Sequence, residues 1–467
     1  MNASAAASVA VVILAAGKGT RMKSDLPKVL HPIAGRPMLH HVLAASETLS
    51  PERRVVVLAP GQEDVAASVA PIPTAIQHPP RGTGDAVRAA LGALEGFTGT
   101  VLVLFGDTPM LSEDTLTRMV AATEGADGAA FVILGFESDN PGRYARLELD
   151  DAGNLLRIIE APDLKEDERS IRLCNGGALA VDGARLADWL GRLDPRNAQG
   201  EFYLFDLLQF ALEEGRRGAV VWVDPVETMG VDSRIGLADA EARMQERLRR
   251  RLMEEGVTLV APETVFLSHD TKIGRDSVVQ PHCVFGPGVT VGEGVEIKSF
   301  SHLEGATVAD GARIGPYARL RPGADLGAGA HIGNFVEVKN ATFGAGAKAN
   351  HLSYVGDASV GAGANIGAGT ITCNYDGYEK HRTEIGAGAF IGSNSSLVAP
   401  VSIGDGALVG AGSTIGDDVG QDDIVVVRGE RTVGEGAAKR FRETRAARKA
   451  ANKTDAARKA GNKTKQK

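Results

Sequence analysis

The first half of the chain alternates short apolar runs with longer mixed segments. The runs are rich in β-branched and aliphatic residues and stand at 9–14, 54–59, 100–105 and 129–134. Each run suits one buried strand, and the intervals between them can hold helices. This alternation predicts an α/β domain with a parallel sheet. Ligands of such sheets bind beyond the carboxyl ends of strands, so the loops after Leu14 and Phe105 are the first candidates for a site.

A different period begins after residue 256. Aliphatic residues, and once Phe285, recur at every sixth position, apart from one five-residue step after Leu303 and a stretch of weaker register after Val338. Glycine often follows them, as in Ile273-Gly274 and Ile332-Gly333. The main members are Ile273, Val279, Phe285, Val291, Ile297, Leu303, Val308, Ile314, Leu320, Leu326, Ile332, Val338, Ile385, Ile391, Leu397, Ile403, Val409 and Ile415. A period of six is typical of a parallel β-helix built from hexapeptide repeats. Residues 373–384 interrupt the period, which predicts an extruded loop.

The segment between these halves is charged and rich in alanine. Met244, Leu248 and Leu252 are spaced four apart, and Gly256 follows them, so we predict an amphipathic connecting helix with a glycine stop. The predicted organisation is an N-terminal domain over 1–235, a linker helix over 236–256, a β-helix over 257–437 and a tail over 438–467.

Charge is divided unevenly along the chain. The tail carries twelve Lys or Arg and two acidic residues, a balance of +10, so the other residues sum to −18 within a net charge of −8. An acidic body argues against nucleic-acid binding by the folded part. The tail contains the near-duplicates AARKAANKT and AARKAGNKT, and its polarity predicts a disordered or transiently helical segment. It can attract an anionic partner such as RNA, although a dispensable extension is the favoured interpretation.

The distribution of glycine agrees with a β-helix in the second half. Of 58 glycines, 29 lie within 257–420, where the corners of a β-helix need small residues.

The cysteines give no sign of a disulfide or metal framework. Cys174, Cys283 and Cys373 lie far apart without a C-x-x-C pair, so neither a disulfide framework nor a thiolate zinc site is indicated. The apolar stretch at 9–16 is shorter than the ~20 residues of a membrane span. We therefore expect a cytoplasmic protein that does not bind membranes.

The loop after the first predicted strand has the sequence LAAGKGTRM over 14–22, followed by Pro27-Lys28. Backbone N–H groups at such a strand-to-helix turn can cradle phosphates. The segment matches neither G-x-x-x-x-G-K-[ST] nor G-x-G-x-x-G, because Met22 occupies the place of the last glycine. Arg21 and Lys28 supply the positive charge that transfer at a triphosphate requires. The alternative is a solvated turn.

A carboxylate follows another predicted strand. Asp107 ends the run Phe105-Gly106-Asp107, and a single carboxylate there suits a Mg²⁺ ion that shares substrate phosphates. An ordinary turn aspartate is the alternative. Asp232, in Gly230-Val231-Asp232, is a candidate second ligand.

A histidine stands out in the β-helix half. His351 has Arg321 and Lys339 before it and Tyr354 after it. A neutral imidazole is the usual general base for freeing an amine to attack an acyl group. A structural role is one alternative. Zinc binding is another, with the candidates His282, His302, His331 and His351, although they lack His-x-x-x-x-His spacing.

Three segments together resemble one bacterial enzyme family. They are LAAGKGTRM with LPKVLH near the start, RLRPGADLGAGAHIGNFVEVKN at 319–340 and GAGTITCNYDGYEKHRTEIG at 367–386. The family is the bifunctional N-acetylglucosamine-1-phosphate uridyltransferase and glucosamine-1-phosphate N-acetyltransferase, and the resemblance covers about residues 9–430. It implies a Rossmann-like nucleotidyltransferase (pyrophosphorylase) domain, a left-handed β-helix with acetyltransferase activity, Mg²⁺ as cofactor, acetyl-CoA as co-substrate and a homotrimer with shared acetyl-transfer sites.

The resemblance also implies site residues. The uridine-nucleotide site would comprise Leu14, Ala15, Ala16, Gly17, Lys28, Gln77, Gly82, Thr83, Phe105, Gly106, Asp107, Ala145, Glu160, Asn175 and Asp232. Arg21 and Lys28 would act at the reacting phosphates, and Asp107 and Asp232 would hold Mg²⁺. The family commonly has asparagine in place of Asp232 and glycine in place of Ala145.

In the β-helix the same comparison implies His351 as proton acceptor. The sugar phosphate would contact Arg321, Lys339, Tyr354 and Asn365, with Glu337 nearby, and acetyl-CoA would contact Ala368, Asn374, Tyr375, Ser393, Ala411 and Arg428.

The implied activity is acetyl transfer to glucosamine 1-phosphate, then uridyl transfer from UTP to N-acetylglucosamine 1-phosphate with release of pyrophosphate. These steps precede peptidoglycan and lipopolysaccharide assembly, and hence cell-wall biogenesis and cell shape. One alternative is a single-activity sugar-1-phosphate nucleotidyltransferase whose β-helix is regulatory. Another is a non-catalytic subunit like those of translation-factor exchange complexes, which tend to lose the phosphate-loop cations, whereas Arg21, Lys28 and Asp107 are present here.

Overall fold

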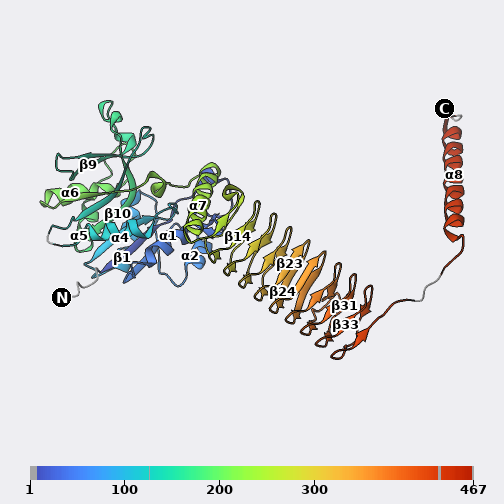
Figure 1. The fold of residues 1–467 in the computed structure, drawn as a ribbon. Coiled ribbons are helices and arrows are strands. Elements are labelled where there is room, and N and C mark those ends of the chain that lie inside the picture. Colours follow the sequence, from blue (N-terminus) through green and yellow to red (C-terminus); the bar gives the residue numbers. More distant parts are fainter. Residues whose placement is uncertain (1–7, 126, 430–432, 465–467) are drawn as a thin grey trace.

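The computed structural model describes residues 8–125, 127–429 and 433–464. Figure 1 shows an N-terminal α/β domain, a straight stack of short strands that extends from it, and a terminal helix that stands apart from both.

The N-terminal domain is built on a sheet with the strand order β11-β7-β10-β6-β1-β4-β5. The strands are β1 (Val9–Leu14), β4 (Arg53–Leu58), β5 (Thr74–Ile76), β6 (Thr100–Phe105), β7 (Phe131–Glu137), β10 (Leu173–Asp182) and β11 (Gly218–Trp222). All neighbours are parallel except that β10 runs antiparallel to β6 and β7. The four strands predicted from the apolar runs, β1, β4, β6 and β7, all run in one direction, as predicted. The sheet also contains one antiparallel strand, β10, because the chain returns there through β8 (Arg146–Leu149) and β9 (Leu155–Ile159) rather than through a crossover helix.

Helices cover both faces of this sheet. They are α1 (Met38–Glu47), α2 (Glu63–Val69), α3 (Thr83–Ala89), α4 (Glu113–Ala121), α5 (Gly183–Arg192) and α6 (Leu207–Glu213). Leu39 of α1 and Leu116 of α4 belong to one buried apolar cluster. Val87 of α3 and Trp189 of α5 belong to the cluster on the other face. This is the two-sided burial that a doubly covered sheet requires.

A hairpin and a long helix join the two halves. The hairpin is β2 (Pro32–Ile33) with β3 (Arg36–Pro37), and the helix is α7 (Arg234–Glu254). Ala34 N donates to Glu241 Oε2 at 2.7 Å, and His269 N donates to Ala34 O at 2.8 Å. The hairpin tip is therefore bonded to both α7 and the first part of the β-helix. The helix begins two residues before the predicted boundary, because Ser233 caps it by accepting from Gly236 N.

The second half is a left-handed parallel β-helix of hexapeptide repeats, as predicted. Its strands are β12 (Thr258–Leu259), β13 (Lys272–Ile273), β14 (Val278–Val279), β15 (Val284–Phe285), β16 (Thr290–Val291), β17 (Glu296–Ile297), β18 (His302–Leu303), β19 (Ala306–Val308), β20 (Arg313–Ile314), β21 (Arg319–Leu320), β22 (Ala324–Leu326), β23 (His331–Asn334), β24 (Glu337–Phe343), β25 (Lys348–His351), β26 (Tyr354–Val360), β27 (Asn365–Ile366), β28 (Ile371–Cys373), β29 (Thr383–Ile385), β30 (Phe390–Ile391), β31 (Ser396–Val398), β32 (Val401–Ile403), β33 (Leu408–Val409), β34 (Thr414–Ile415) and β35 (Ile424–Val425). Residues one coil apart pair in register, as Lys272 does with Thr290. The aliphatic residue of each repeat is buried in one continuous core.

One coil is longer than the others. Ala341 pairs with Ala358, 17 residues later, whereas Ala358 pairs with Thr383, 25 residues later. The extra residues leave the coil between β28 and β29, which confirms the predicted interruption. Tyr378, near the tip of this loop, is almost fully exposed.

The basic tail contains one more helix. A continuous helix, α8 (Ala437–Thr464), occupies the segment for which the sequence predicts disorder or transient helix. Alanine, lysine and arginine have high helix propensity, and Figure 1 shows α8 apart from the β-helix.

Candidate functional site

A cavity of about 690 Å³ lies at the carboxyl ends of β1, β4, β5 and β6. Ten residues predicted for the nucleotide site line it, namely Leu14, Ala15, Ala16, Gly17, Lys28, Gln77, Gly82, Thr83, Phe105 and Asp107. They come from segments far apart in the sequence, and the parallel strands bring their ends to one edge.

Lys28 and Asp107 face each other in this cavity as an ion pair. Lys28 begins a 3₁₀ turn, Lys28–Leu30, that packs against the phosphate-loop candidate. Gly19 has φ +60°, and a Cβ added there would lie 2.5 Å from Lys28 Cβ. Glycine is therefore required at this position for the loop to approach the lysine.

A second ion pair lies beside the first. Arg21 Nη2 is 2.6 Å from Asp232 Oδ2, and Val231 N donates to Asp107 O at 2.9 Å. This backbone bond joins the loops that carry the two predicted metal ligands. The structure thus brings Asp107 and Asp232 onto adjoining loops, each beside a cation, although Arg21 and Asp232 do not line the cavity itself.

The turn at Gly82-Thr83 is held in place by Gln77 and by the segment at 202–204. Gly82 has φ +105°, and a Cβ there would lie 2.8 Å from Phe202 O. Gln77 Nε2 donates to Gly82 O at 2.9 Å, and Leu204 N donates to Thr83 Oγ1 at 3.2 Å. The turn is therefore fixed both by Gln77, which lines the cavity, and by the segment at 202–204, which does not.

Sequence reasoning missed several residues that line the cavity. They are Lys18, Val29, Ala59, Pro60, His78, Pro80, Ala86 and Glu201. Ala59 ends the apolar run at 54–59 and Pro60 follows it, so the rule that ligands bind beyond the carboxyl ends of strands, used above for the loops after Leu14 and Phe105, would have found them. Glu201 is brought in by a loop that no local pattern marks.

Five residues predicted for the nucleotide site lie outside the lining of the cavity, namely Gly106, Ala145, Glu160, Asn175 and Asp232. Asn175 N donates to Ala145 O at 2.9 Å, and Asn175 Oδ1 accepts from Gly177 N at 2.7 Å. Gly106, the neighbour of Asp107, is likewise absent from the lining and donates its N–H to Leu14 O. Glu160 is half-buried, and burial together with nearby Asp206, Asp163 and Glu201 raises its pKa to about 7.

Glu160 gives a pH-dependent prediction for stability. Because its folded pKa of about 7 exceeds its ordinary value of 4.5, the native state binds the extra proton between these values and loses stability as pH rises through them. Glu160→Gln removes the buried charge, so at pH 8 the variant should be more stable than wild type by up to ~3 kcal/mol, with little difference near pH 4.5. Denaturant unfolding across this pH range measures the effect. Glu166→Gln, at an exposed glutamate nearby, is the control, and pH-independent differences for Glu160→Gln would contradict the prediction.

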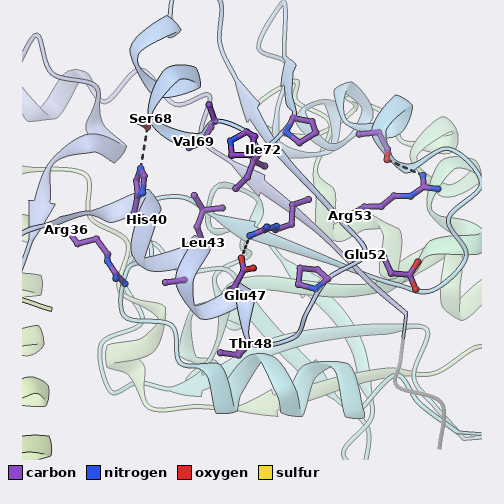
Figure 2. A pocket seen from close by; sticks show the side chains of 17 residues that line it. Arg36, His40, Leu43, Glu47, Thr48, Glu52, Arg53, Ser68, Val69 and Ile72 are labelled. Atoms are coloured by element: carbon purple, nitrogen blue, oxygen red, sulfur yellow. Dashed lines mark hydrogen bonds and ion pairs between the residues drawn. The ribbon is translucent and has the colours of Figure 1, made fainter. Parts of the chain in front are cut away.

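A larger cavity, of about 1080 Å³, lies at the opposite edge of the sheet, where β4 begins. Figure 2 shows its lining from α1, the start of β4 and the segment before β5. Arg54 pairs with Glu47 there, and Arg53 Nη1 donates to Ala93 O and Glu95 O. None of the predicted site residues lines this cavity. Size alone therefore does not identify the site.

In the β-helix, His351 has a fixed tautomer. Its Nδ1 lies 2.5 Å from Asn334 Oδ1, and Asn334 is its register partner on the preceding coil. An amide oxygen only accepts hydrogen bonds, so Nδ1 carries the proton and the exposed Nε2 keeps a lone pair. Asn334 was missed from the sequence, because a residue 17 positions away becomes a neighbour only once the coil length is known.

The predicted sugar-phosphate residues lie mainly on one sheet face. Arg321 Nη1 donates to Glu337 Oε1 at 2.8 Å, and Glu337 pairs in register with Tyr354. Lys339 follows two positions along β24. Asn365 is on β27, in the sheet that also holds β25 and His351. The structure therefore places Asn365 on the face of His351 rather than among the other three.

The predicted acetyl-CoA residues form a line along one edge. Successive coils are linked there by Gly369 N to His351 O, Asn394 N to Ala368 O and Gly412 N to Ser393 O. Arg428 Nε donates to Ala411 O at 2.9 Å, which extends the line. Asn374 is buried and Tyr375 is exposed where the loop leaves the coil. A continuous edge of this kind suits an elongated ligand that begins beside His351.

Comparisons with known proteins agree with both halves. The model of a MobA-like NTP transferase domain matches residues 11–160, and that of the bacterial transferase hexapeptide (six repeats) matches 270–305 and 382–417. Bifunctional protein GlmU of Paramagnetospirillum magneticum is 55% identical over 446 residues, which cover 96% of this chain and 99% of that protein. GlmU of Rhodospirillum rubrum is 56% identical, with 93% and 97% covered, and GlmU of Sphingopyxis alaskensis is 51% identical, with 95% and 98% covered. The chain belongs to the bifunctional GlmU family.

One alternative from the sequence, zinc binding by the β-helix histidines, can be compared with this GlmU family structure. Within residues 8–125, 127–429 and 433–464, no group of three or more His, Cys, Asp or Glu side chains could hold a metal ion, so the zinc interpretation of the β-helix histidines has no donor set. Among the same residues, no helix is long and apolar enough to cross a membrane.

Proposed function

We propose that this GlmU family member transfers an acetyl group from acetyl-CoA to glucosamine 1-phosphate and then a uridyl group from UTP to the resulting N-acetylglucosamine 1-phosphate. The observation that carries the proposal is the presence of two separate sites in one chain. One is a cavity that gathers the phosphate-loop residues, Lys28 and Asp107, and the other is an edge that begins at His351 with its tautomer fixed by Asn334.

In the acetyl-transfer step, Arg321 and Lys339 hold the sugar phosphate by charge. The amine nitrogen attacks the thioester carbonyl carbon, the C–S bond breaks, and CoA leaves as the thiolate, which then takes from the His351 imidazolium the proton that the amine gave up. His351 Nε2 accepts the amine proton, and its Nδ1–H stays bonded to Asn334 Oδ1 at 2.5 Å. The imidazole thus becomes a cation that the asparagine oxygen stabilises.

In the uridyl-transfer step, a phosphate oxygen of the sugar phosphate attacks the α-phosphorus of UTP. The bond to the β-phosphate breaks, and pyrophosphate leaves. Lys28, together with Arg21, offsets the negative charge that gathers there, while the turn at Gly82-Thr83 and Gln77 hold the nucleoside. The product is UDP-N-acetylglucosamine.

The residues present fit a Mg²⁺ ion. Two carboxylates, Asp107 and Asp232, stand on loops joined by the Val231 to Asp107 backbone bond, and oxygen ligands shared with phosphates and water are those that Mg²⁺ prefers. When bound, Mg²⁺ would neutralise phosphate charge and polarise the phosphorus–oxygen bonds. Asp232 adds a charge where the family commonly has asparagine, which favours retention of the ion.

Chelation should separate the two activities. With excess EDTA, uridyl transfer is expected to fall to background, because Lys28 and Arg21 alone leave much of the triphosphate charge unbalanced. Acetyl transfer should keep its rate, because no metal takes part in it. Pyrophosphate and CoA release, measured in the same samples with and without added Mg²⁺, check this. Equal loss of both activities would contradict the assignment of the ion to the N-terminal site.

We further propose a cytoplasmic homotrimer. An exposed ladder of stacked rings, His282, Phe300, Tyr317 and Phe335, runs along the edge that leads to His351. Such an apolar edge suits packing against another copy, and the sites at this edge are open in the single chain. A solution mass of three times 48.7 kDa would support the trimer. For the basic tail, RNA binding stays a prediction that the structure does not test.

A coupled assay tests the proposed function. Purified protein receives glucosamine 1-phosphate, acetyl-CoA and UTP with Mg²⁺, and both CoA and pyrophosphate are followed. Release of both, with pyrophosphate dependent on prior acetylation, supports the bifunctional enzyme. Pyrophosphate alone, from a supplied sugar 1-phosphate, would favour the single-activity nucleotidyltransferase, and neither product would favour the non-catalytic subunit.

A further inference from the structure

Asp357 occupies an unusual backbone position in β26. Its φ is +48°, and only 8% of the residue is exposed. On the preceding coils the same corner is occupied by Gly305, Gly323 and Asn340, all at positive φ. Glycine adopts this conformation without steric cost, whereas an aspartate does so less readily. The backbone alone therefore does not explain an acidic residue here.

The Asp357 carboxylate bridges three coils. Its Oδ1 accepts from Asn340 Nδ2 at 2.6 Å, and its Oδ2 accepts from Asn374 Nδ2. Burial by itself raises the pKa of Asp357, but the two amide hydrogen bonds and the charges of Lys339 and Lys380 outweigh it and lower the pKa. The group is ionised at neutral pH, so it can only accept hydrogen bonds.

An acceptor-only partner decides which way the Asn374 amide points. Its Nδ2 must face Asp357, and the other Nδ2 hydrogen is directed toward Tyr354 OH, 3.5 Å away. Asn374 Oδ1 then points away from the carboxylate, and within the described part of the chain no hydrogen bond to it is formed. The Tyr354 oxygen accepts from Asn374, which leaves its own O–H to donate outward.

We propose that Asp357 is a positioning residue for acetyl transfer, which orients Asn374 so that Oδ1 accepts a hydrogen bond from a substrate N–H. The proposal rests on the acetyltransferase activity proposed above. The N–H belongs either to the amine of the sugar phosphate or to an amide of the acetyl-CoA arm. Asp357 touches neither substrate, and its effect passes through Asn374 and from there to Tyr354.

Asp357→Asn is the direct test, because it keeps the shape and removes the acceptor-only character. The new amide has an NH₂ group of its own, so the Asn374 amide is no longer held in one orientation. We expect kcat/KM for acetyl transfer to fall by about 10- to 100-fold while uridyl transfer is unchanged. A rise in KM for acetyl-CoA identifies the amide as the N–H donor, and a rise in KM for glucosamine 1-phosphate identifies the amine.

Asp357→Gly tests the role without straining the corner. Gly323 occupies the same corner two coils earlier, so a glycine fits the backbone, and this variant should fold and lose acetyl transfer as Asp357→Asn does. Asn340→Ala is the matched control. It removes the other hydrogen bond to the carboxylate and leaves Asn374 held, so acetyl transfer should change by less than about threefold.

A double-mutant cycle separates positioning from general support of the fold. If Asp357 acts through Asn374, then in an Asn374→Ala background Asp357→Asn should add less than about a twofold loss. Additive losses in acetyl transfer would overturn the proposal. Wild-type rates of acetyl transfer in both Asp357→Asn and Asp357→Gly would overturn it as well. Wild-type protein that releases no CoA from glucosamine 1-phosphate and acetyl-CoA would instead count against the proposed function.

Discussion

Replacement of His351 by alanine is expected to lower acetyl transfer by about 10²- to 10⁴-fold. The variant lacks the group that takes the proton from the attacking amine, and among the residues that the structure describes no other histidine is hydrogen-bonded to Asn334. Uridyl transfer should keep its wild-type rate, because the cavity that holds Lys28 and Asp107 belongs to the other domain. Release of CoA from acetyl-CoA with glucosamine 1-phosphate measures the loss, and release of pyrophosphate measures the unaffected activity.

The matched control is His302→Ala. His302 is an exposed histidine at the start of a β-helix strand, so its replacement alters a similar surface without touching the proposed base. An acetyl-transfer rate for His351→Ala within a few-fold of wild type would exclude this histidine as the base. The shape of the pH profile adds a second check, because the base must be neutral to act.

Lys28→Ala is expected to lower uridyl transfer by about 10²- to 10³-fold. Lys28 is the cavity cation paired with Asp107. Its loss leaves more of the negative charge on the departing pyrophosphate unneutralised, and it leaves the Asp107 carboxylate without this ion-pair partner. The effect should appear mainly in kcat, because the charge it offsets develops in the transition state. Steady-state pyrophosphate release across UTP concentrations separates kcat from KM.

Lys23→Ala is the control for this substitution. Lys23 is an exposed lysine of the same segment and does not line the cavity. Similar losses in Lys23→Ala and Lys28→Ala would show that net charge, rather than the placed ammonium group, matters. Acetyl transfer should be unchanged in both variants.

The fold class was predictable from sequence because each half has a strong period. Aliphatic residues six apart, such as Ile314 and Leu320, can all be buried together in only one regular fold, the parallel β-helix. Each apolar run, such as 100–105, suits one buried strand of a sheet. The antiparallel direction of β10 was not predictable, because it follows from the path of the chain after β7. In the tail, a high helix propensity accompanies the polarity from which the sequence predicts disorder or a transient helix, and α8 lies there in the structure.

The site was predictable where its residues are close in sequence or follow strand ends. Leu14 to Gly17 and Asp107 fall in that group, and the structure brings them together. Asn334 and Asp357 escaped because their partners lie 17 residues away. The raised pKa of Glu160 escaped as well, because it arises first from burial and then from carboxylates of separate loops, and only the folded chain brings both about.

The stacked coils of the β-helix set a fixed spacing along its ligand edge. Parallel strands lie ~4.8 Å apart, so the three coil steps from His351 through Ala368 and Ser393 to Ala411 span about 14 Å whatever side chains they carry. Coils of 17, 18 and 25 residues occur in this chain, so insertions at corners change loops without changing that length. Gain or loss of a whole coil would alter it by one fixed increment. The reach of the ligand edge is thus set by the number of coils, and it can change only in steps.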